Sequence, residues 1–165
     1  MSLAQTPSSA QARRAPRAWR LFNAGRILGN ALTRFESRVL ALMALAGHGG
    51  TRLSHINLTR HLDIEGTRIT ELARRANMTN AAMTELIDQC EQLGLVLRQP
   101  DPLDRRARVV CFTEQGQAWL TAFGQAVKKA EKELIAEIGP EASGVLLDAL
   151  AAYGGVVQSL GSTKA

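Results

Sequence analysis

Residues 70–116 decide the fold, and they read TELARRANMTNAAMTELIDQCEQLGLVLRQPDPLDRRARVVCFTEQG. Thr70 and Thr79 are each placed to cap a helix, the first one brief and the second one closed by Gly94. Only Asn77–Thr79 separates the two helices, and two short helices joined by so tight a turn cross steeply. The second helix has one apolar face, made of Met83, Leu86, Ile87, Cys90 and Leu93. The stretch therefore predicts a helix-turn-helix.

A β-hairpin is predicted directly after these helices. The runs at 95–99 and 108–112 are rich in β-prone residues, and they flank a tip, residues 100–107, with two prolines and charges of both signs. A hairpin in this place is the wing of a winged helix-turn-helix. Thr113 is then placed to cap the next helix.

Helices are expected on the N-terminal side of this domain. Apolar residues recur at spacings of four and three over Trp19–Ala46, and Gly47–Gly50 ends the pattern. A shorter helix over Ser54–Leu62, capped by its first residue, precedes a turn at Gly66. A seam as long as the first one requires a long partner helix.

Helices are also expected on the C-terminal side. The helix after Thr113 ends at Gly139–Pro140, and Glu141–Leu160 again shows apolar residues at spacings of three and four, with a bend at Gly154–Gly155. The terminal helices thus carry apolar seams without a core of their own. Burying these seams against a second copy of the chain is the economical solution, and a two-fold dimer is the commonest closed form.

The predicted fold class is mainly α with a small β wing, a winged helix-turn-helix flanked by dimerisation helices. Residues 1–16 are predicted to be a flexible basic arm and 17–50 to hold the N-terminal dimerisation helix. Residues 51–113 then form the winged domain, and 114–165 form the C-terminal dimerisation helices. At 165 residues, the chain is interpreted as half of a two-fold assembly.

The charge distribution favours a polyanionic partner. The formal net charge is +5, and residues 1–80 hold twelve arginines against four acids. Every arginine precedes residue 109, and every lysine follows residue 127. Arginine has a planar fork that suits phosphates and guanine edges, so this half of the chain points to nucleic acid. On charge alone, a solvated basic surface is an equal alternative.

Several classes of protein are excluded or disfavoured. The chain has no apolar run long enough to span a membrane, and its N-terminal residues lack the apolar stretch of a secretory signal. Two cysteines cannot form a disulfide framework, which favours a reducing, cytoplasmic location. No nucleophile elbow, phosphate-binding loop, zinc-protease pair or dinucleotide fingerprint occurs, so we expect neither an enzyme nor a cofactor.

The same residues resemble a known family. Its motifs are matched by 66–73 (GTRITELA), 77–79 (NMT), 90–96 (CEQLGLV), 102–107 (PLDRRA) and 112–116 (FTEQG). This pattern is similar to that of the MarR family of bacterial transcriptional regulators. The resemblance covers about residues 52–120 in motif detail. It implies a homodimeric repressor-type regulator that binds a pseudo-palindromic operator in double-stranded DNA and responds to a small aromatic or phenolic effector.

The second helix of the motif is expected to enter the major groove and read bases from its first turns. Its predicted DNA-contacting residues are Thr79, Asn80, Ala81, Thr84 and Glu85. Glu85 departs from the family pattern, which often has a basic residue nearby. A carboxylate beside phosphates accepts a hydrogen bond from cytosine or pairs with a neighbouring arginine. We favour surface pairs of Glu85 and Asp88 with Arg74 or Arg75.

The wing is expected to place guanidinium groups in a narrow minor groove. The resemblance implies that Asp104 pairs with Arg106, which leaves Arg105 as the groove residue, beside Arg108. All three arginines are alternatively solvated loop charges.

Arg74 and Arg75, at the end of the first helix of the motif, are expected to face DNA backbone phosphates, which position the protein without reading sequence.

An effector crevice is expected between the terminal helices and the winged domain. Its predicted lining residues are Trp19, Met43, His48 and His55, because the long N-terminal helix passes over the Ser54–Leu62 helix. This pocket follows from the layout and the resemblance.

Two alternatives remain open. One is a winged-helix module for protein–protein contact that binds no DNA, and the acidic pair Glu85 and Asp88 favours it. The other is a redox- or metal-responsive regulator. A metal shared among His48, His55, Asp63 and Glu65 is one form of it, although Cys90 and Cys111 are interpreted as small buried hydrophobes.

Overall fold

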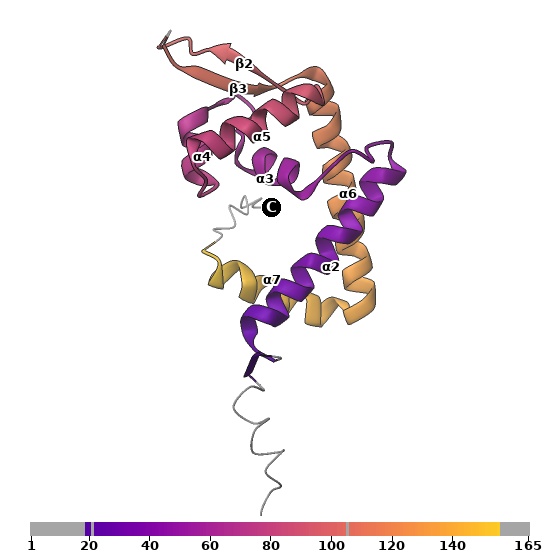
Figure 1. Cartoon of the computed structure of the whole chain (residues 1–165). Helices are drawn as coiled ribbons and strands as arrows, with labels where there is room; N and C mark the ends of the chain where they lie inside the picture. Colours follow the sequence, from indigo (N-terminus) through magenta and orange to yellow (C-terminus); the bar gives the residue numbers. More distant parts are fainter. Residues whose placement is uncertain (1–18, 21, 105, 156–165) are drawn as a thin grey trace, which may run out of the picture.

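The computed structural model describes residues 19–20, 22–104 and 106–155 (Figure 1). The predicted basic arm and the end of the last predicted helix, beyond residue 155, lie outside the described residues. The helices are α2 (Ala24–Leu45), α3 (Leu53–His61), α4 (Ile69–Arg75), α5 (Asn80–Gln92), α6 (Glu114–Ile138) and α7 (Pro140–Tyr153). The strands are β1 (Thr67–Arg68), β2 (Val96–Pro100) and β3 (Arg108–Phe112). In the described part of the chain, no helix combines the length and apolarity needed to cross a membrane.

The helix-turn-helix forms as predicted. The Thr79 hydroxyl accepts a hydrogen bond from the Ala82 N–H at 3.1 Å, so Thr79 caps α5. Asn77 takes a positive φ of 52° in the turn, and Gly94, at φ 69°, follows the end of α5. Four of the five predicted apolar residues of α5 are buried; Leu93 is 39% exposed because it lies at the C-cap, past the last helical turn.

Two predicted caps are wrong. Ser54 lies inside α3, which begins at Leu53; there the Arg52 N–H donates to His55 Nδ1 at 3.2 Å. Thr70 lies inside α4, because strand β1 leads directly into that helix and Arg68 is its N-cap. In α3 the His55 side chain caps the backbone of the residue before the helix, and in α4 strand β1 continues directly into the helix. A capping residue type one position inside the helix therefore does not set either start.

The wing is part of a three-stranded antiparallel sheet with the order β1-β3-β2. Strand β3 pairs with β2 from Val96 opposite Phe112 to Pro100 opposite Arg108. Thr67 and Arg68 pair with the other edge of β3, opposite Val110 and Val109. Sequence analysis missed β1 because two residues are too few to show a strand alternation.

The core lies between α3, α4, α5 and the sheet, and the C-terminal part of α2 and residues of α6 up to Ala130 close it. Its most buried large side chains are Met43, Leu58, Leu72, Met83, Ile87, Val96, Val110 and Trp119. Thr113 begins α6 as predicted, with its hydroxyl accepting from the Gly116 N–H at 2.9 Å.

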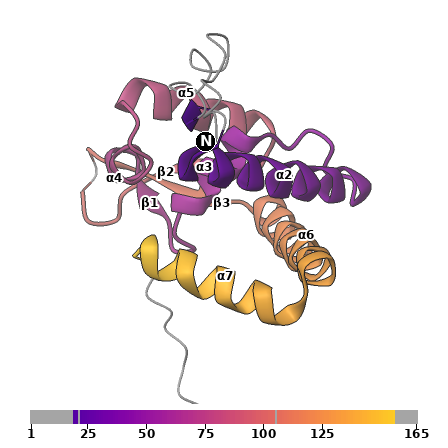
Figure 2. The same ribbon diagram turned by 90° about the horizontal axis from the view of Figure 1, so that it is seen from below.

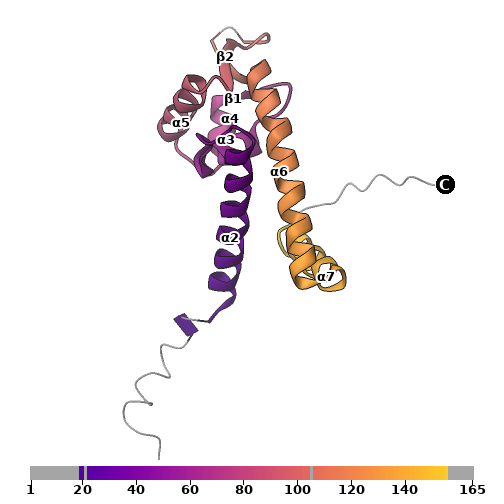
Figure 3. The same ribbon diagram turned by 90° about the vertical axis from the view of Figure 1, so that its right-hand side faces the viewer.

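The long helices α2 and α6 extend side by side away from the winged body, and α7 crosses near their far ends (Figures 2 and 3). Two forked ion pairs join them: Arg34 with Glu137 and Arg38 with Glu133, each at 2.6 Å. Helix α2 begins at Ala24, five residues later than predicted, because the Asn23 side chain caps it by accepting from the Arg26 N–H at 3.0 Å.

Helix α7 ends at Tyr153, and Gly154–Gly155 form a turn after it, not a bend within it. Residues of α2 and α7 line an apolar cleft of about 410 Å³: Ala24, Ile27, Leu28, Leu146, Ala149, Leu150 and Tyr153. Further large apolar side chains are exposed on these helices, among them Leu32 at 53% and Val145 at 68%. The seams of the terminal helices are therefore not buried within one chain.

The junction of α6 with the wing generates a stability prediction. A Cβ at Gly116 would lie 1.9 Å from the Leu95 carbonyl oxygen, whereas a Cβ at Gly124 in the same helix meets nothing within 4 Å. Gly116→Ala is expected to lower the free energy of unfolding by about 1–3 kcal/mol or more. This is the usual cost of overpacking, and here backbone atoms must move. Gly124→Ala is the matched control and is expected to gain up to about 1 kcal/mol. Urea unfolding measures both; equal stabilities of the two variants would contradict the packing described for Gly116.

Candidate nucleic-acid interface

The exposed face of α5 is the side of the helix opposite the core. The side chains predicted to point outward are all exposed: Asn80, Ala81, Thr84, Glu85 and Asp88. Thr79 is also exposed, although its hydroxyl is engaged as the cap. Short polar side chains at the start of a helix are suited to contact base edges in a major groove. The hairpin β2–β3 extends beside α5 and projects from the body (Figure 1).

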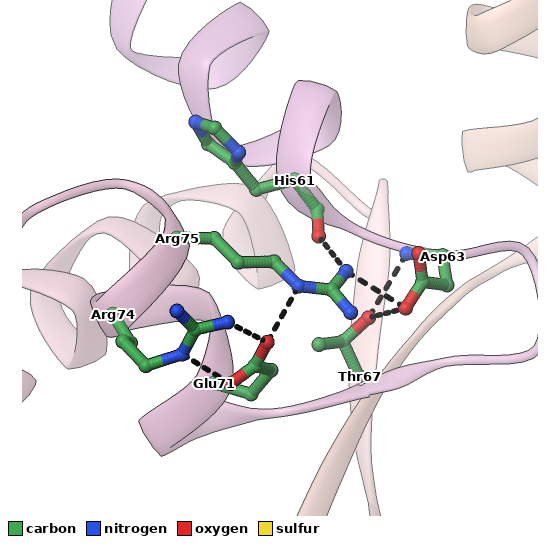
Figure 4. A network of polar contacts seen from close by, with 6 residues as sticks. All are labelled: His61, Asp63, Thr67, Glu71, Arg74 and Arg75. Carbon is green, nitrogen blue, oxygen red and sulfur yellow. Dashed lines mark hydrogen bonds and ion pairs between the residues drawn. The ribbon is translucent and has the colours of Figure 1, made fainter. Parts of the chain in front are cut away.

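Arg74 and Arg75 form ion pairs with nearby acidic residues (Figure 4). Glu71 accepts from Arg74 Nη2 at 2.6 Å and from Arg75 Nε at 2.8 Å. Arg75 Nη1 also donates to Asp63 at 2.8 Å and to the His61 carbonyl at 3.0 Å. The predicted pairs with Glu85 and Asp88 are therefore wrong, because Glu71 lies three and four residues earlier on the same helix face.

This cluster braces the end of α3 against α4 and β1. Asp63 accepts from the Thr67 hydroxyl at 3.1 Å, and its N–H donates back to that oxygen at 2.9 Å. Hydrogen bonds from Arg74 and Arg75 lower the pKa of Glu71 to about 2. The Arg74 side chain is 73% exposed and the Arg75 side chain 33%, so Arg74 is the more accessible guanidinium.

Asp88 pairs with a residue that sequence analysis missed. Arg98 of β2 reaches across to α5, where its Nη2 lies 2.6 Å from Asp88 Oδ1 and also donates to the Thr84 carbonyl at 3.1 Å. Arg98 further pairs with Glu91, which also accepts from the Arg98 backbone N–H at 2.8 Å. Glu91 and Arg98 are separated by the end of α5 and a turn, so helical spacing does not predict their contact. Within the described residues, Glu85 has no ion-pair partner.

The wing tip is held by Asp101, which was also missed. Its carboxylate is buried and accepts from the backbone N–H groups of Leu103 at 2.7 Å and Asp104 at 3.3 Å. The other oxygen lies 2.5 Å from Arg68 Nε. An aspartate that accepts from the N–H two residues later is a common turn-forming arrangement, and this was the available sequence signal.

The predicted pairing of the Asp104 and Arg106 side chains is replaced by a backbone contact. Asp104 Oδ1 accepts from the Arg106 backbone N–H at 3.0 Å, which leaves the guanidinium outside the turn. Arg106 and Arg108 are exposed, and Arg105 lies outside the described residues. The wing thus presents cationic side chains at its tip while an aspartate holds its backbone.

The predicted effector residues divide into two groups. His48 and His55 line a pocket of about 170 Å³, together with Gly47, Gly50, Thr51, Leu93, Leu95, Gln115 and Trp119. Met43 is fully buried and does not line it. Trp19 is 66% exposed and lies next to Asn23 at the opposite end of α2. The tryptophan of the pocket is Trp119.

The polar groups of this pocket are partly committed. Trp119 Nε1 donates to the Thr51 hydroxyl at 2.9 Å, and the Trp119 ring stacks on Phe123. His55 is buried and accepts at Nδ1 from Arg52, so its neutral ring carries the proton on Nε2. Burial and the nearby Arg52 charge lower the pKa of His55.

The metal and redox alternatives find no support in the described part of the chain. There, no three side chains among histidine, cysteine, aspartate and glutamate gather as metal ligands, so His48, His55, Asp63 and Glu65 do not form a site. Burial raises the pKa of Cys90 to about 11, and Cys111 is half-buried in β3. A thiol with a raised pKa is a poor nucleophile at neutral pH.

Comparisons with known proteins agree with this geometry. Residues 58–107 match the model of the MarR family. The chain is 30% identical over 108 residues to the transcriptional regulator YdgJ of Bacillus subtilis, covering 66% of this chain and 65% of that relative. The chain thus spans just under two thirds of this curated relative.

Three solved structures share the fold. Reduced MarR from E. coli has a TM-score of 0.68 at 20% identity, over 80% of this chain and 96% of that one. The repressor CouR bound to a 23-mer DNA duplex has a TM-score of 0.65 at 22% identity, over 84% and 96% of the two chains. CouR from Rhodococcus jostii RHA1 has also been solved with p-coumaroyl-CoA, with a TM-score of 0.63 at 21% identity, over 79% and 91%.

The Glu71 cluster generates a pH prediction. The folded-state pKa of Glu71 is lowered from 4.5 to about 2, so its contribution to stability is present above about pH 4.5 and is lost as the pH falls toward 2. Glu71→Gln is expected to flatten the fall of Tm between about pH 5 and pH 2, measured by circular dichroism. Glu65→Gln, which changes an exposed carboxylate in the preceding turn, is the control. If the Tm of Glu71→Gln falls with pH in parallel with that of the wild type, the cluster does not stabilise the fold.

Proposed function

The winged helix-turn-helix domain of this chain belongs to the MarR family, and from that premise we propose that the chain is a sequence-specific DNA-binding transcriptional regulator of the repressor type. The observation that carries the proposal is the exposed face of α5 beside a wing with Arg106 and Arg108 at its surface. Thr79 and the outward residues Asn80, Ala81, Thr84 and Glu85 would meet base edges and phosphates. A DNA target also implies a cytoplasmic location.

The remaining contacts would go to the minor groove and the backbone. Asp104 shapes the wing turn, and Arg105, Arg106 and Arg108 are the proposed minor-groove residues. Arg74 is the proposed phosphate contact, and Arg75 contributes mainly by bracing α4.

The proposed active form is a homodimer. The apolar cleft between α2 and α7 and the exposed Leu32 and Val145 support it, since a large apolar patch marks an association surface. We assign dimerisation to residues 17–50 and 114–165. A two-fold dimer would present two α5 helices to successive major grooves, about 34–36 Å apart, on a pseudo-palindromic operator.

The proposed effector site is the pocket of His48, His55 and Trp119. A cavity of about 150 Å³ holds one benzene ring, so about 170 Å³ suits a single-ring aromatic or phenolic compound. The Nε2–H of His55 would donate to a carboxylate or phenolate oxygen. The pocket touches the loop after α2, the turn before β2 and the start of α6, so a ligand there contacts both the helices of the proposed dimer and the base of the wing.

DNA binding is tested by titrating the full chain into a random duplex at several salt concentrations. We expect a steep negative slope of log K against log salt and two chains per duplex by analytical ultracentrifugation. Arg105→Ala should weaken binding without dissociating the dimer. The control Arg60→Ala, which removes an exposed arginine of α3, should leave the affinity for the duplex unchanged. Absence of duplex binding at low salt would overturn the proposal and favour the protein-interaction module.

The effector site is tested in Trp19→Phe, which leaves Trp119 as the one tryptophan of the chain. Benzoate and hydroxybenzoates should quench its fluorescence saturably and weaken duplex affinity by about 5–150-fold, the usual range of allosteric coupling. His48→Leu should reduce the quenching, and the control Arg60→Ala, on the exposed side of α3, should not. Quenching that is unaffected by His48→Leu would place the ligand elsewhere.

A further inference from the structure

Arg98 connects the wing to the recognition helix through a single side chain. Its guanidinium contacts the Thr84 carbonyl, Asp88 and Glu91, and its backbone N–H also donates to Glu91. Thr84, Asp88 and Glu91 lie four and three residues apart, so they form one stripe along α5. The side chain of Arg98 thus spans about two turns of the helix.

The contacts require the geometry of arginine. A guanidinium presents its donors in a rigid planar fork, which allows it to hold two carboxylates and a carbonyl in one fixed arrangement. A lysine ammonium carries the same charge but is a point donor on a flexible stem. Charge and geometry at this position can therefore be separated by one substitution.

The stripe borders the proposed reading surface and not the core. The side chain of Asp88 is 52% exposed and that of Arg98 is 22% exposed, whereas the core face of α5 is fully covered by other residues. The turn between the C-terminal end of α5 and β2 is held by a contact that does not involve Arg98: the Leu95 N–H donates to the Cys90 carbonyl at 2.9 Å. Loss of the Arg98 contacts would thus leave the fold in place and free the angle between α5 and the wing.

We propose that Arg98 is a positioning residue for DNA recognition: it fixes the orientation of α5 relative to β2, so that the base-reading helix and the groove-reading wing meet one duplex in a single register. The proposal rests on the proposed function. Its consequence is that Arg98 controls the ratio of specific to non-specific affinity without touching DNA. A residue of the reading surface itself would contact bases or phosphates directly.

The test compares Arg98→Lys with Arg60→Lys in the full chain. Arg60 is also an arginine paired with a glutamate, Glu36, but it lies on the exposed side of α3. The probes are the duplex that the wild type selects from a random pool and a scrambled duplex of equal length. Arg98→Lys should lower the ratio of the two affinities about tenfold, at the low end of what one base contact contributes, and leave the salt slope on the scrambled duplex unchanged. Arg60→Lys should keep the wild-type ratio.

Circular dichroism and Tm verify folding, and Glu91→Gln provides a second variant, which removes a partner and keeps Arg98. It should also lower the ratio. A wild-type ratio in both variants would overturn the proposal. An equal loss of affinity for both duplexes would overturn it too, because that result describes a charge or phosphate contact. If the wild type binds no duplex, the proposed function fails, and that outcome is distinct from a variant that behaves like the wild type.

Discussion

The structure depends on the burial of one face of α5. Met83, Leu86, Ile87 and Cys90 are packed against α3, α4 and the sheet, and burying such side chains contributes about 1.5–3 kcal/mol each for the larger ones. Because side chains project from a helix at fixed angles, burying one face determines which residues of α5 point to solvent. The polar face beside the wing is therefore a consequence of the core. The residues of this surface can therefore be polar and exposed, because the buried face of α5 supplies the packing that holds the helix in place.

The distribution of arginines has a different meaning once their partners are known. Charge along the sequence suggested a basic half of the molecule, yet Arg34, Arg38, Arg68, Arg75 and Arg98 are all engaged with acids. Most of these pairs hold two elements together, so they reduce the number of arginines of the described residues that are available to a polyanion. Surface ion pairs contribute little individually, but a fork that joins two elements orients them.

The order of the helices and of the hairpin could be predicted from the sequence because periodicity, Thr79, Gly94 and Thr113 are local signals that act within a few residues. The helix starts at Leu53 and Ile69 could not, since they are decided by contacts with Arg52 and β1. The outward face of α5 followed from helical spacing. Asp101 and Arg98 did not, because their partners are brought to them by the hairpin and the turn before it. Likewise, Trp119 reaches the pocket only through the packing of α6.

The attachment of α6 to the wing gives this helix the properties of a lever. Thr113 bonds to the Leu95 carbonyl, Gln115 to the Leu93 carbonyl, and Gly116 presses against Leu95, so the first turn is fastened at the root of the hairpin. The 25 residues of the helix span about 37 Å. A tilt of about 5° at the fastened end moves the far end by about 3 Å. A small rotation of the winged body therefore produces a larger movement at the far end of α6. Conversely, a movement of the far end rotates the wing by a small angle, because the rigid helix connects the two.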